Sequence, residues 1–498
     1  MNAPALQTDA AELASMLGDW ASSAHPLYQD LGIKLESLIQ EGHLAPETLL
    51  PPERVLAAAL VVSRTTVTAA YDALRARGLV ETLQGSGTWV RSRSGDTPVD
   101  PAATFFPWPN LLFPAPAKDR PTDPEVLGLR STDVPASSIF LEAIETMTPA
   151  DWRTALGNEG YLPAGVPELR AAIARHLTAQ GLPTSADELM ITTGAQQALH
   201  LVISLYVRPG RRVVLEDPTY AGALPLLRSA RARLVPVPID EHGMCIDRVR
   251  EAMTTGAPAL IYVVPTYHNP TGVLLSEQRR RELVGLASRK RVPIVESLAL
   301  MDTGLTQFDP PPPLGAIDRQ LVISIGSLST LFWAGLRIGW IRAEKSVLGR
   351  LKRLKANLDL GTPLIGQFVA ARALERAADA RLDRAQQLRA NYQHLVSLLE
   401  SQIPEWSVTE PAGGASLWTR VPFGSATEFA QLASRQGVAL LPGPMFSPTR
   451  GHDDHLRIPF VLDDASMTEA VARLRAAWSD YSQREPHSAP AAQVAAPA

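Results

Sequence analysis

A run of hydrogen-bonding side chains after Ser63 has the composition of a helix that reads DNA bases. Ser63 suits a helix N-cap, because its hydroxyl can accept from a backbone amide that has no partner within the helix. The next side chains are Arg64, Thr65 and Thr66, with Thr68 one turn further on. Arginine can bind guanine through two hydrogen bonds, and threonine can contact several groups on base edges. A helix that begins here would carry base-reading chemistry on its first turns.

Hydrophobic spacing places this run within a small domain of three helices and a hairpin. The expected elements are a helix after Pro26, helices over 53–60 and 64–77, and β segments over 79–82 and 88–90. Gly78 fits the left-handed position that ends a helix, while Gly85 and Gly87 belong to an exposed tip between the β segments. This order is that of a winged helix-turn-helix, whose third helix enters the major groove.

Charge supports this prediction only locally. Residues 63–93 include five arginines and two acidic residues, whereas residues 26–93 include equal numbers of positive and negative residues. The whole chain has a formal net charge of −4, so any contact with nucleic acid must be confined to one part of it. On this pattern alone, a small helical domain with a solvated face of mixed charge explains the same features.

The segment 49–90 resembles the DNA-binding domain of the GntR family. The similarity runs through 52–54, 56–57, 63–67, Leu74, 78–79 and 85–88. The resemblance implies that Arg54, Arg64 and Thr66 touch DNA, and that the tip at Gly87 approaches the backbone or the minor groove. It favours double-stranded operator DNA as a partner over the helical domain without a nucleic-acid role.

The remainder of the chain resembles the pyridoxal-phosphate aminotransferases of fold type I. The matching motifs are 161–165, 189–197, 216–220, 266–272, 326–329 and 335–339. A GntR-type head on such a body is typical of the MocR family of regulators. The implied fold is an α/β multidomain chain, with a mainly parallel sheet flanked by helices and a smaller C-terminal α/β part. The glycines in these motifs also suit ordinary turns, and the arginines also suit structural ion pairs.

The resemblance implies a site for an anionic ligand. The backbone amides of Gly194, Ala195 and Gln196 would hold a phosphate at a helix start, and Arg337 would add a charged fork. The resemblance also implies that Tyr220 stacks on a flat ring, that Asn269 donates to a ring hydroxyl, and that Arg457 binds a carboxylate. The remaining implied ligand-binding positions lie at strand ends and are Ser297, Ser327 and Ser329.

The chain departs from the family where the cofactor does its chemistry. Thr330 follows Ser329, at the position of the lysine that forms the Schiff base, and threonine has no amine to do so. Ser297 stands where the family carries an aspartate, and a hydroxyl cannot neutralise a pyridinium. Ala299 or Leu300 replaces a tyrosine. We therefore expect no catalytic residue and no covalently bound cofactor; pyridoxal phosphate could bind only non-covalently.

Other lysines are not expected to take over this role. Lys290, Lys345, Lys352 and Lys355 do not follow the strand that ends at 326–329, and a solvated surface is the better interpretation for all of them.

Composition and proline content set the predicted boundaries. The chain is 45% hydrophobic and 20% charged, has one cysteine, Cys245, and shows neither a secretory signal nor an apolar run of membrane-spanning length, which predicts a cytoplasmic protein. No metal site is expected. The expected division is a mobile N-terminus over 1–25, the winged helix-turn-helix over 26–93, a proline-rich linker over 94–127, the aminotransferase-like domain over 128–483, and a disordered tail over 484–498.

These observations predict a transcription regulator whose aminotransferase-like domain dimerises and senses a small anionic effector without turnover. In the homodimer, Tyr161 would reach the partner's pocket. Three alternatives stay open at this point: a regulator that holds pyridoxal phosphate or its amino-acid adduct non-covalently, a residual aminotransferase, and a body that only dimerises.

Overall fold

The structure is a computed structural model, and it describes residues 8–21, 25–41, 43–45, 48–83, 87–91, 126–157, 160–306 and 309–484. The predicted linker up to residue 125, nearly all of the predicted tail, Gly85 and the first seven residues lie outside the described residues. The predicted roles of those segments therefore stay predictions.

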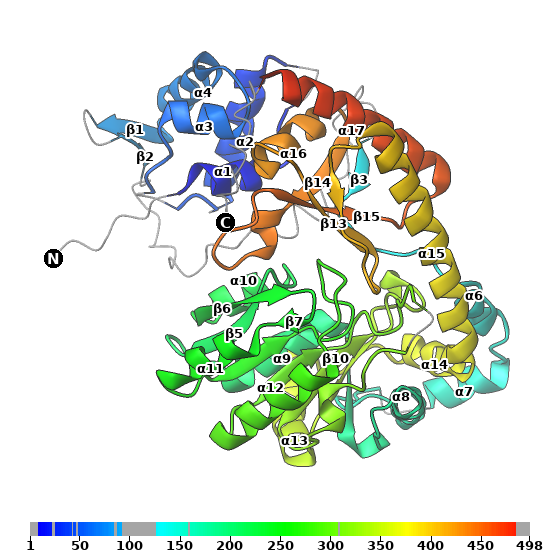
Figure 1. The fold of residues 1–498 in the computed structure, drawn as a ribbon. Helices are drawn as coiled ribbons and strands as arrows, with labels where there is room; N and C mark the ends of the chain where they lie inside the picture. The colour runs from blue at the N-terminus through cyan, green and yellow to red at the C-terminus, as the bar shows by residue number, and fades with distance from the viewer. Residues whose placement is uncertain are drawn as a thin grey trace, which may run out of the picture.

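The head is a winged helix-turn-helix (Figure 1). Its elements are α2(Leu27–Gln40), α3(Glu53–Ala59), α4(Arg64–Ala76), β1(Val80–Leu83) and β2(Gly87–Val90). The Ser63 hydroxyl caps α4 by accepting from the Thr66 amide at 3.1 Å, and Gly78 has a φ of +69° after the helix, both as predicted. Val67 and Leu74 of α4 are buried in the head's core, while β1 and β2 pair antiparallel.

Part of the predicted mobile N-terminus is an ordered helix with a buried face. Helix α1(Ala10–Leu17) buries Leu13, Ala14 and Leu17 against the head, and Trp20 joins the same core. The sequence pattern is short, and its apolar residues find partners only when distant segments come together. The helix therefore depends on tertiary packing and not on local propensity.

The large domain is built on an eight-stranded sheet in the order β4-β11-β10-β9-β8-β5-β6-β7. Its strands are β4(Leu189–Thr192), β5(Arg212–Asp217), β6(Arg233–Asp240), β7(Gly243–Met244), β8(Leu260–Val263), β9(Ile294–Ser297), β10(Val322–Ser327) and β11(Gly339–Arg342). The central neighbours β6, β5, β8, β9 and β10 run parallel, which confirms the predicted sheet type. Because these strands run parallel, their carboxyl ends meet at one edge of the sheet. Sheets of this kind carry helices on both faces.

Helices cover both faces of that sheet. One face packs on α9(Ala195–Tyr206), α10(Ala223–Ser229) and α13(Lys345–Asp359), and the other on α11(Ile246–Thr254) and α12(Glu277–Lys290). Helices α6(Ser138–Glu145), α7(Pro149–Leu156), α8(Pro167–Ala179) and α14(Leu364–Ala373) form the far end of the domain (Figure 1).

The smaller part of the body is a second sheet in the order β12-β13-β15-β14-β3. Its strands are β3(Leu127–Leu129), β12(Ser407–Val408), β13(Ser416–Arg420), β14(Val438–Pro442) and β15(His455–Pro459), packed on α15(Ala377–Gln402), α16(Ala426–Arg435) and α17(Asp464–Arg484). We call this part the small domain. Strand β3 begins at the last residue of the predicted linker and pairs parallel to β14, so the body begins with a strand of its C-terminal part.

Candidate functional site

The first turn of α4 presents the predicted base-reading residues to solvent. Arg64 is 70% exposed, and its guanidinium donates to the Glu53 carboxylate at 3.2 Å through two nitrogens. The Thr68 hydroxyl donates to the same carboxylate at 2.9 Å, while Ser63 and Thr65 are exposed. Helix α3 thus supplies an acidic partner that orients the arginine, and the ion pair lies on the surface, where such pairs contribute little.

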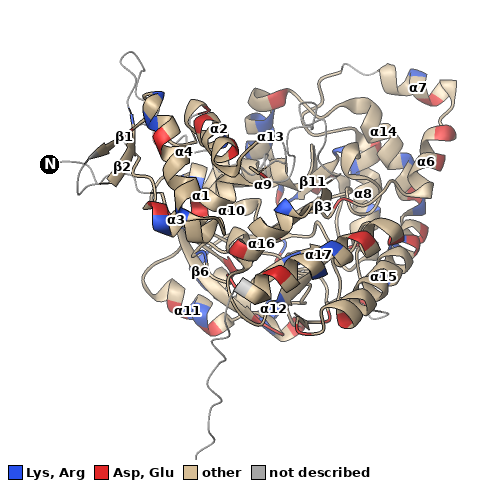
Figure 2. Cartoon of the chain, turned by 90° about the horizontal axis from the view of Figure 1, so that it is seen from above, with Lys and Arg blue, Asp and Glu red and all other residues tan. Residues whose placement is uncertain are grey.

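An open groove of about 570 Å³ extends from this turn to the wing. It is lined by Glu53, Arg54 and Arg64 on one side, and by Gly87 and Thr88 on the other. Gly87 has a φ of +98°, and a Cβ atom there would lie 2.7 Å from the Leu49 side chain, so glycine is required for both reasons. Charged residues of both signs are interspersed over the helices, including α3 and α4 (Figure 2).

In the body, the predicted phosphate residues gather where β4 passes into α9. Gly194 has a φ of +114°, directly before the first residue of α9, Ala195. A Cβ atom at Gly194 would lie 2.8 Å from the Arg337 guanidinium, which donates to the Thr193 carbonyl at 2.7 Å. The Arg337 side chain is exposed. A helix N-terminus beside an exposed guanidinium is suited to an anion such as phosphate.

Aromatic and amide side chains continue the site away from this helix start. The Tyr220 hydroxyl donates to the Gln196 side chain at 3.1 Å, and burial raises the pKa of Tyr220. The Gln196 amide donates in turn to the Gly222 carbonyl at 2.8 Å. Asn269 keeps a buried side-chain oxygen with no hydrogen-bond partner among the described residues. Buried polar atoms are usually paired, so this oxygen is a candidate contact for a ligand.

Arg457 on β15 is the most deeply buried charge of the site. It is 3% exposed, donates to the backbone carbonyl of Arg130, and lies 5.0 Å over the Phe446 ring. Its Nε atom has no partner among the described residues, and burial lowers the pKa of Arg457 to about 10. The Tyr220 hydroxyl and the Asp133 carboxylate oppose this lowering of the Arg457 pKa electrostatically. A buried guanidinium held by a neutral carbonyl is suited to accept an anion.

The serines and the threonine at the strand ends lie in the same region. The Ser327 hydroxyl donates to the Ser329 hydroxyl at 2.9 Å, and the Thr330 hydroxyl donates to the Ala299 carbonyl at 2.9 Å. Ser297 is buried at the end of β9, opposite Ile325 of β10. Its neighbour Glu296 points to the other face of the sheet, where backbone amides and Ser324 bind its carboxylate.

The prediction for Lys355 was wrong. Its side chain is fully buried on α13, and its ammonium donates to Asp359 at 2.7 and 2.9 Å and to Gln197 at 3.3 Å. Asp359 lies one helical turn beyond Lys355, so an i,i+4 ion pair was visible in the sequence. Gln197 also accepts from the Thr193 amide next to the phosphate residues, which gives this pair a supporting position behind them.

The described part of the chain offers neither a membrane span nor a metal cluster. No helix there is long and apolar enough to cross a membrane. No group of three or more His, Cys, Asp or Glu side chains in the same residues is arranged to hold a metal ion.

The residues of the site have the chemistry to hold a phosphate and a carboxylate. The helix start at Gly194 with Arg337 offers a place for phosphate, and the incompletely paired Arg457 offers a place for a carboxylate. Thr330 brings a hydroxyl to the end of β10.

Comparison with known proteins agrees with this architecture. The family of class I and II aminotransferases matches residues 142–474, and the gntR family of bacterial regulatory proteins matches residues 27–90. The HTH-type transcriptional regulator YisV of Bacillus subtilis is 30% identical over 81% of this chain and 86% of that protein. The probable rhizopine catabolism regulatory protein MocR of Rhizobium meliloti is 28% identical over 91% of this chain and 94% of that protein.

Solved structures support the same assignment for the body. LysN, the alpha-aminoadipate aminotransferase of Thermus thermophilus, was solved with N-(5'-phosphopyridoxyl)-L-leucine. It matches with a TM-score of 0.66 and 28% identity, over 72% of this chain and 94% of LysN. The fold is one that typically binds pyridoxal phosphate. The chain belongs to the family of class I and II aminotransferases, and its GntR-type head gives it the two-part architecture of the HTH-type transcriptional regulators related to MocR.

Proposed function

We propose that the chain is a DNA-binding transcription regulator whose body senses an anionic, amino-acid-like or phosphorylated small molecule without turnover. The observation that carries this proposal is Thr330, a hydroxyl bonded to the Ala299 carbonyl at the end of β10, in a body joined to a DNA-binding head. By position along the chain, it replaces the lysine of the catalytic relatives. A hydroxyl cannot form the covalent bond on which transamination depends.

The pocket would recognise its ligand through two charged groups, a phosphate at one end of the ligand and a carboxylate at the other. The amides at the start of α9 and Arg337 would hold a phosphate, and Arg457 would hold a carboxylate. Tyr220 and Asn269 would be partners for a flat polar ring between these two ends. The adduct N-(5'-phosphopyridoxyl)-L-leucine, which LysN binds in its crystal structure, carries both ends and is therefore a suitable probe. Pyridoxal phosphate supplies an electron sink when an enzyme holds it. Here it would be held by non-covalent contacts alone.

A titration of the full-length protein with this adduct and with pyridoxal phosphate tests the proposal. We expect saturable binding of the adduct, a visible absorbance that is lost on prolonged dialysis, and no turnover above background with amino donors. Borohydride treatment of the protein with pyridoxal phosphate should attach pyridoxyl groups only to exposed lysines, and to no lysine of the pocket. A pyridoxyl-modified lysine in the pocket, or measurable transamination, would refute the sensor.

The exposed apolar surface of the body supports a homodimer. Leu141 and Ile144 on α6, Leu156 on α7, Ile365 on α14, and Trp333 are all exposed, and α6 and α7 both contact α14. Exposed apolar side chains that gather on neighbouring helices are typical of an interface. We propose that a second copy of the chain covers it, with the 71%-exposed Tyr161 directed at the partner's pocket. Light scattering should show a dimer for the wild type and a monomer for Leu141→Asp with Ile144→Asp.

A further inference from the structure

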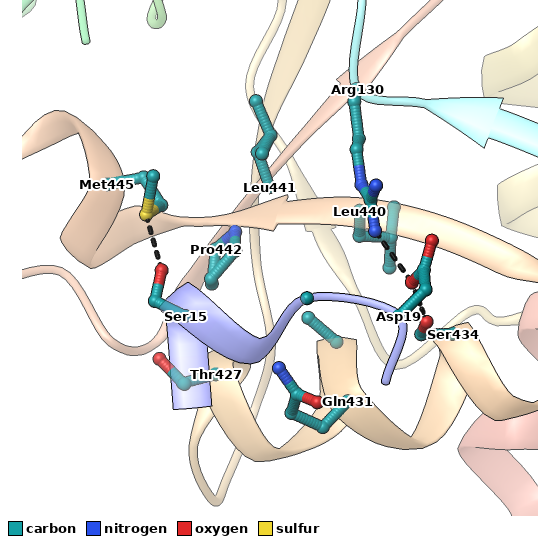
Figure 3. Close-up of a pocket in the computed structure, with 12 residues that line it drawn as sticks. Ser15, Asp19, Arg130, Thr427, Gln431, Ser434, Leu440, Leu441, Pro442 and Met445 are labelled. Carbon is teal, nitrogen blue, oxygen red and sulfur yellow. Dashed lines mark hydrogen bonds and ion pairs between the residues drawn. The ribbon is translucent and has the colours of Figure 1, made fainter. Parts of the chain in front are cut away.

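The DNA-binding head rests on the small domain through α1, which contacts both α3 of the head and α16 of the body. Leu13 and Ala14 of this helix are fully buried. The Gln431 side chain on α16 donates to the Ala14 carbonyl at 2.8 Å. The Ser15 hydroxyl donates to the Met445 sulfur at 2.7 Å (Figure 3). The helix therefore belongs to both units and holds the head against the body.

An ion pair reinforces this contact just beyond the end of α1. Asp19 binds Arg130 of the body at 2.7 Å, and the Ser434 hydroxyl on α16 donates to the same carboxylate (Figure 3). The Asp19 and Arg130 side chains are only 13% and 7% exposed. Removing one partner of a pair that is shielded from water leaves a charge without compensation, so such a pair favours one arrangement of head and body strongly over another.

Arg130 also connects this contact to the ligand pocket. It follows β3, and its backbone carbonyl accepts a hydrogen bond from the Arg457 guanidinium. Its side chain thus holds the head while its backbone holds the arginine suited to a ligand carboxylate. A carboxylate is a stronger acceptor for a guanidinium than a neutral carbonyl is. An anion that accepts from Arg457 Nη2 would therefore compete with the Arg130 carbonyl for that nitrogen.

The body also contacts the turn that precedes the recognition helix. The Arg435 guanidinium on α16 donates to the carbonyls of Leu60 and Val61, at 2.9 and 3.2 Å, in the turn between α3 and α4. Ser63, the cap of α4, lines an open cavity of about 430 Å³ together with Glu428 of the body. In the docked arrangement a body carboxylate therefore shares a cavity with the start of the recognition helix, and it would repel DNA phosphates that approach this cavity.

We propose that the docked head is an autoinhibited arrangement, released when an anionic ligand takes Arg457 from the Arg130 carbonyl and thereby loosens the Asp19–Arg130 ion pair. This inference rests on the proposed sensor function and names the contacts that would transmit the signal. The ligand has a means of shifting the equilibrium, because it gains a donor at Arg457 that the Arg130 carbonyl occupies in the docked arrangement. We call the three residues Asp19, Arg130 and Arg457 the relay.

The first experiment needs no ligand and uses Asp19→Asn in the full-length chain. Hydrogen exchange of α1 should become faster, and affinity for a duplex selected by the wild type from a random-sequence pool should rise by about 5- to 150-fold, the usual range of coupling between two sites. Asp247→Asn, which removes an exposed ion pair on α11, is the matched control and should leave both at wild-type values. Unchanged exchange and affinity in Asp19→Asn would overturn the autoinhibitory contact.

Two further variants test the proposal independently, in case the Asp19→Asn variant does not fold. Arg435→Gln loosens the turn before α4 from the other side and should raise DNA affinity in the same direction. Arg457→Leu removes the donor to the Arg130 carbonyl and should also speed hydrogen exchange of α1 without any ligand. Thermal unfolding of each variant shows whether it is folded. A folded Arg457→Leu with wild-type exchange in α1 would exclude the relay.

The last arm adds N-(5'-phosphopyridoxyl)-L-leucine to wild type and to Asp19→Asn. We expect the adduct to raise DNA affinity of the wild type, and to add little in the variant, which is already released. An equal response in both proteins would refute the relay while leaving the sensor function intact. Failure of the adduct to bind would refute the proposed function instead, and the ligand-free variants would still decide whether the contact inhibits.

Discussion

The head and the body present the arginines that we propose bind their ligands in opposite ways. Arg64 is 70% exposed on the head and is paired with Glu53 at the surface, whereas Arg457 is 3% exposed in the body and donates to a backbone carbonyl. An exposed ion pair is worth about 0–1 kcal/mol, so Arg64 can leave Glu53 for a base at little cost. A buried guanidinium without a carboxylate is unfavourable until an anion arrives.

This difference shows two routes to recognition within one chain. The head reads a long polyanion by offering solvated groups on a rigid scaffold, and the fold needs to supply only the helix and its cap. Under the proposed function the body would hold a small ligand, and it buries polar atoms, such as Arg457 Nε and Asn269 Oδ1, that have no partners among the described residues.

The largest expected effect comes from placing an amine in the pocket. In Thr330→Lys, incubation with pyridoxal phosphate and borohydride should attach a pyridoxyl group to residue 330, because a lysine amine can react where a hydroxyl cannot. The wild type should show none at this residue by mass spectrometry. Transamination should not appear in the variant, since Ser297 cannot neutralise a pyridinium. A variant that is folded but unmodified at residue 330 would place the ligand pocket elsewhere.

The buried side of the comparison is tested by Arg457→Leu. Loss of a hydrogen bond to a charged group should weaken binding of N-(5'-phosphopyridoxyl)-L-leucine by about 1.5–3 kcal/mol, or about 10- to 150-fold, by calorimetry. Pyridoxal phosphate lacks the amino-acid carboxylate and serves as the internal control, with nearly unchanged affinity. Equal losses for both ligands would assign Arg457 to the fold and not to the carboxylate.

The sequence was sufficient for features that depend on neighbouring residues. Ser63 and Gly78 mark the ends of α4, and Gly194 precedes α9, because caps and left-handed positions are local requirements. The order of the head's elements and the sheet type of the body followed from the same signals and from the family resemblance.

Features that join distant segments were not accessible in this way. Asp19 and Arg130 are 111 positions apart, and neither stands in a recognisable motif, so only the folded chain shows that α1 contacts α16. Lys355 was assigned to a solvated surface because it falls beyond the Arg337 motif and does not follow the strand that ends at 326–329, although Asp359 at i+4 indicated a pair. Burial of that pair depends on α9, which lies far earlier in the sequence.

The exposed side of the comparison is tested by Arg64→Ala. Removal of an arginine that reads a base should cost about 1–3 kcal/mol of binding free energy and should relax the preference at one position of the operator. Fluorescence anisotropy with the selected duplex and with single-base variants measures both. Unchanged affinity at matched salt would show that α4 does not place Arg64 at a base edge.

The smallest effect is expected from Arg91→Ala at the end of the wing strand β2. Arg91 is exposed and lies 3.5 Å from Glu81, so its guanidinium is available to a phosphate without a large rearrangement. Loss of one phosphate contact should weaken binding by about fivefold at 0.15 M salt and lower the salt slope by about one. The loss should be the same for selected and random duplexes, because phosphates carry no base sequence. A loss confined to the selected duplex would mean that the wing also reads bases, and the contrast between Arg64 and Arg91 within the head would no longer hold.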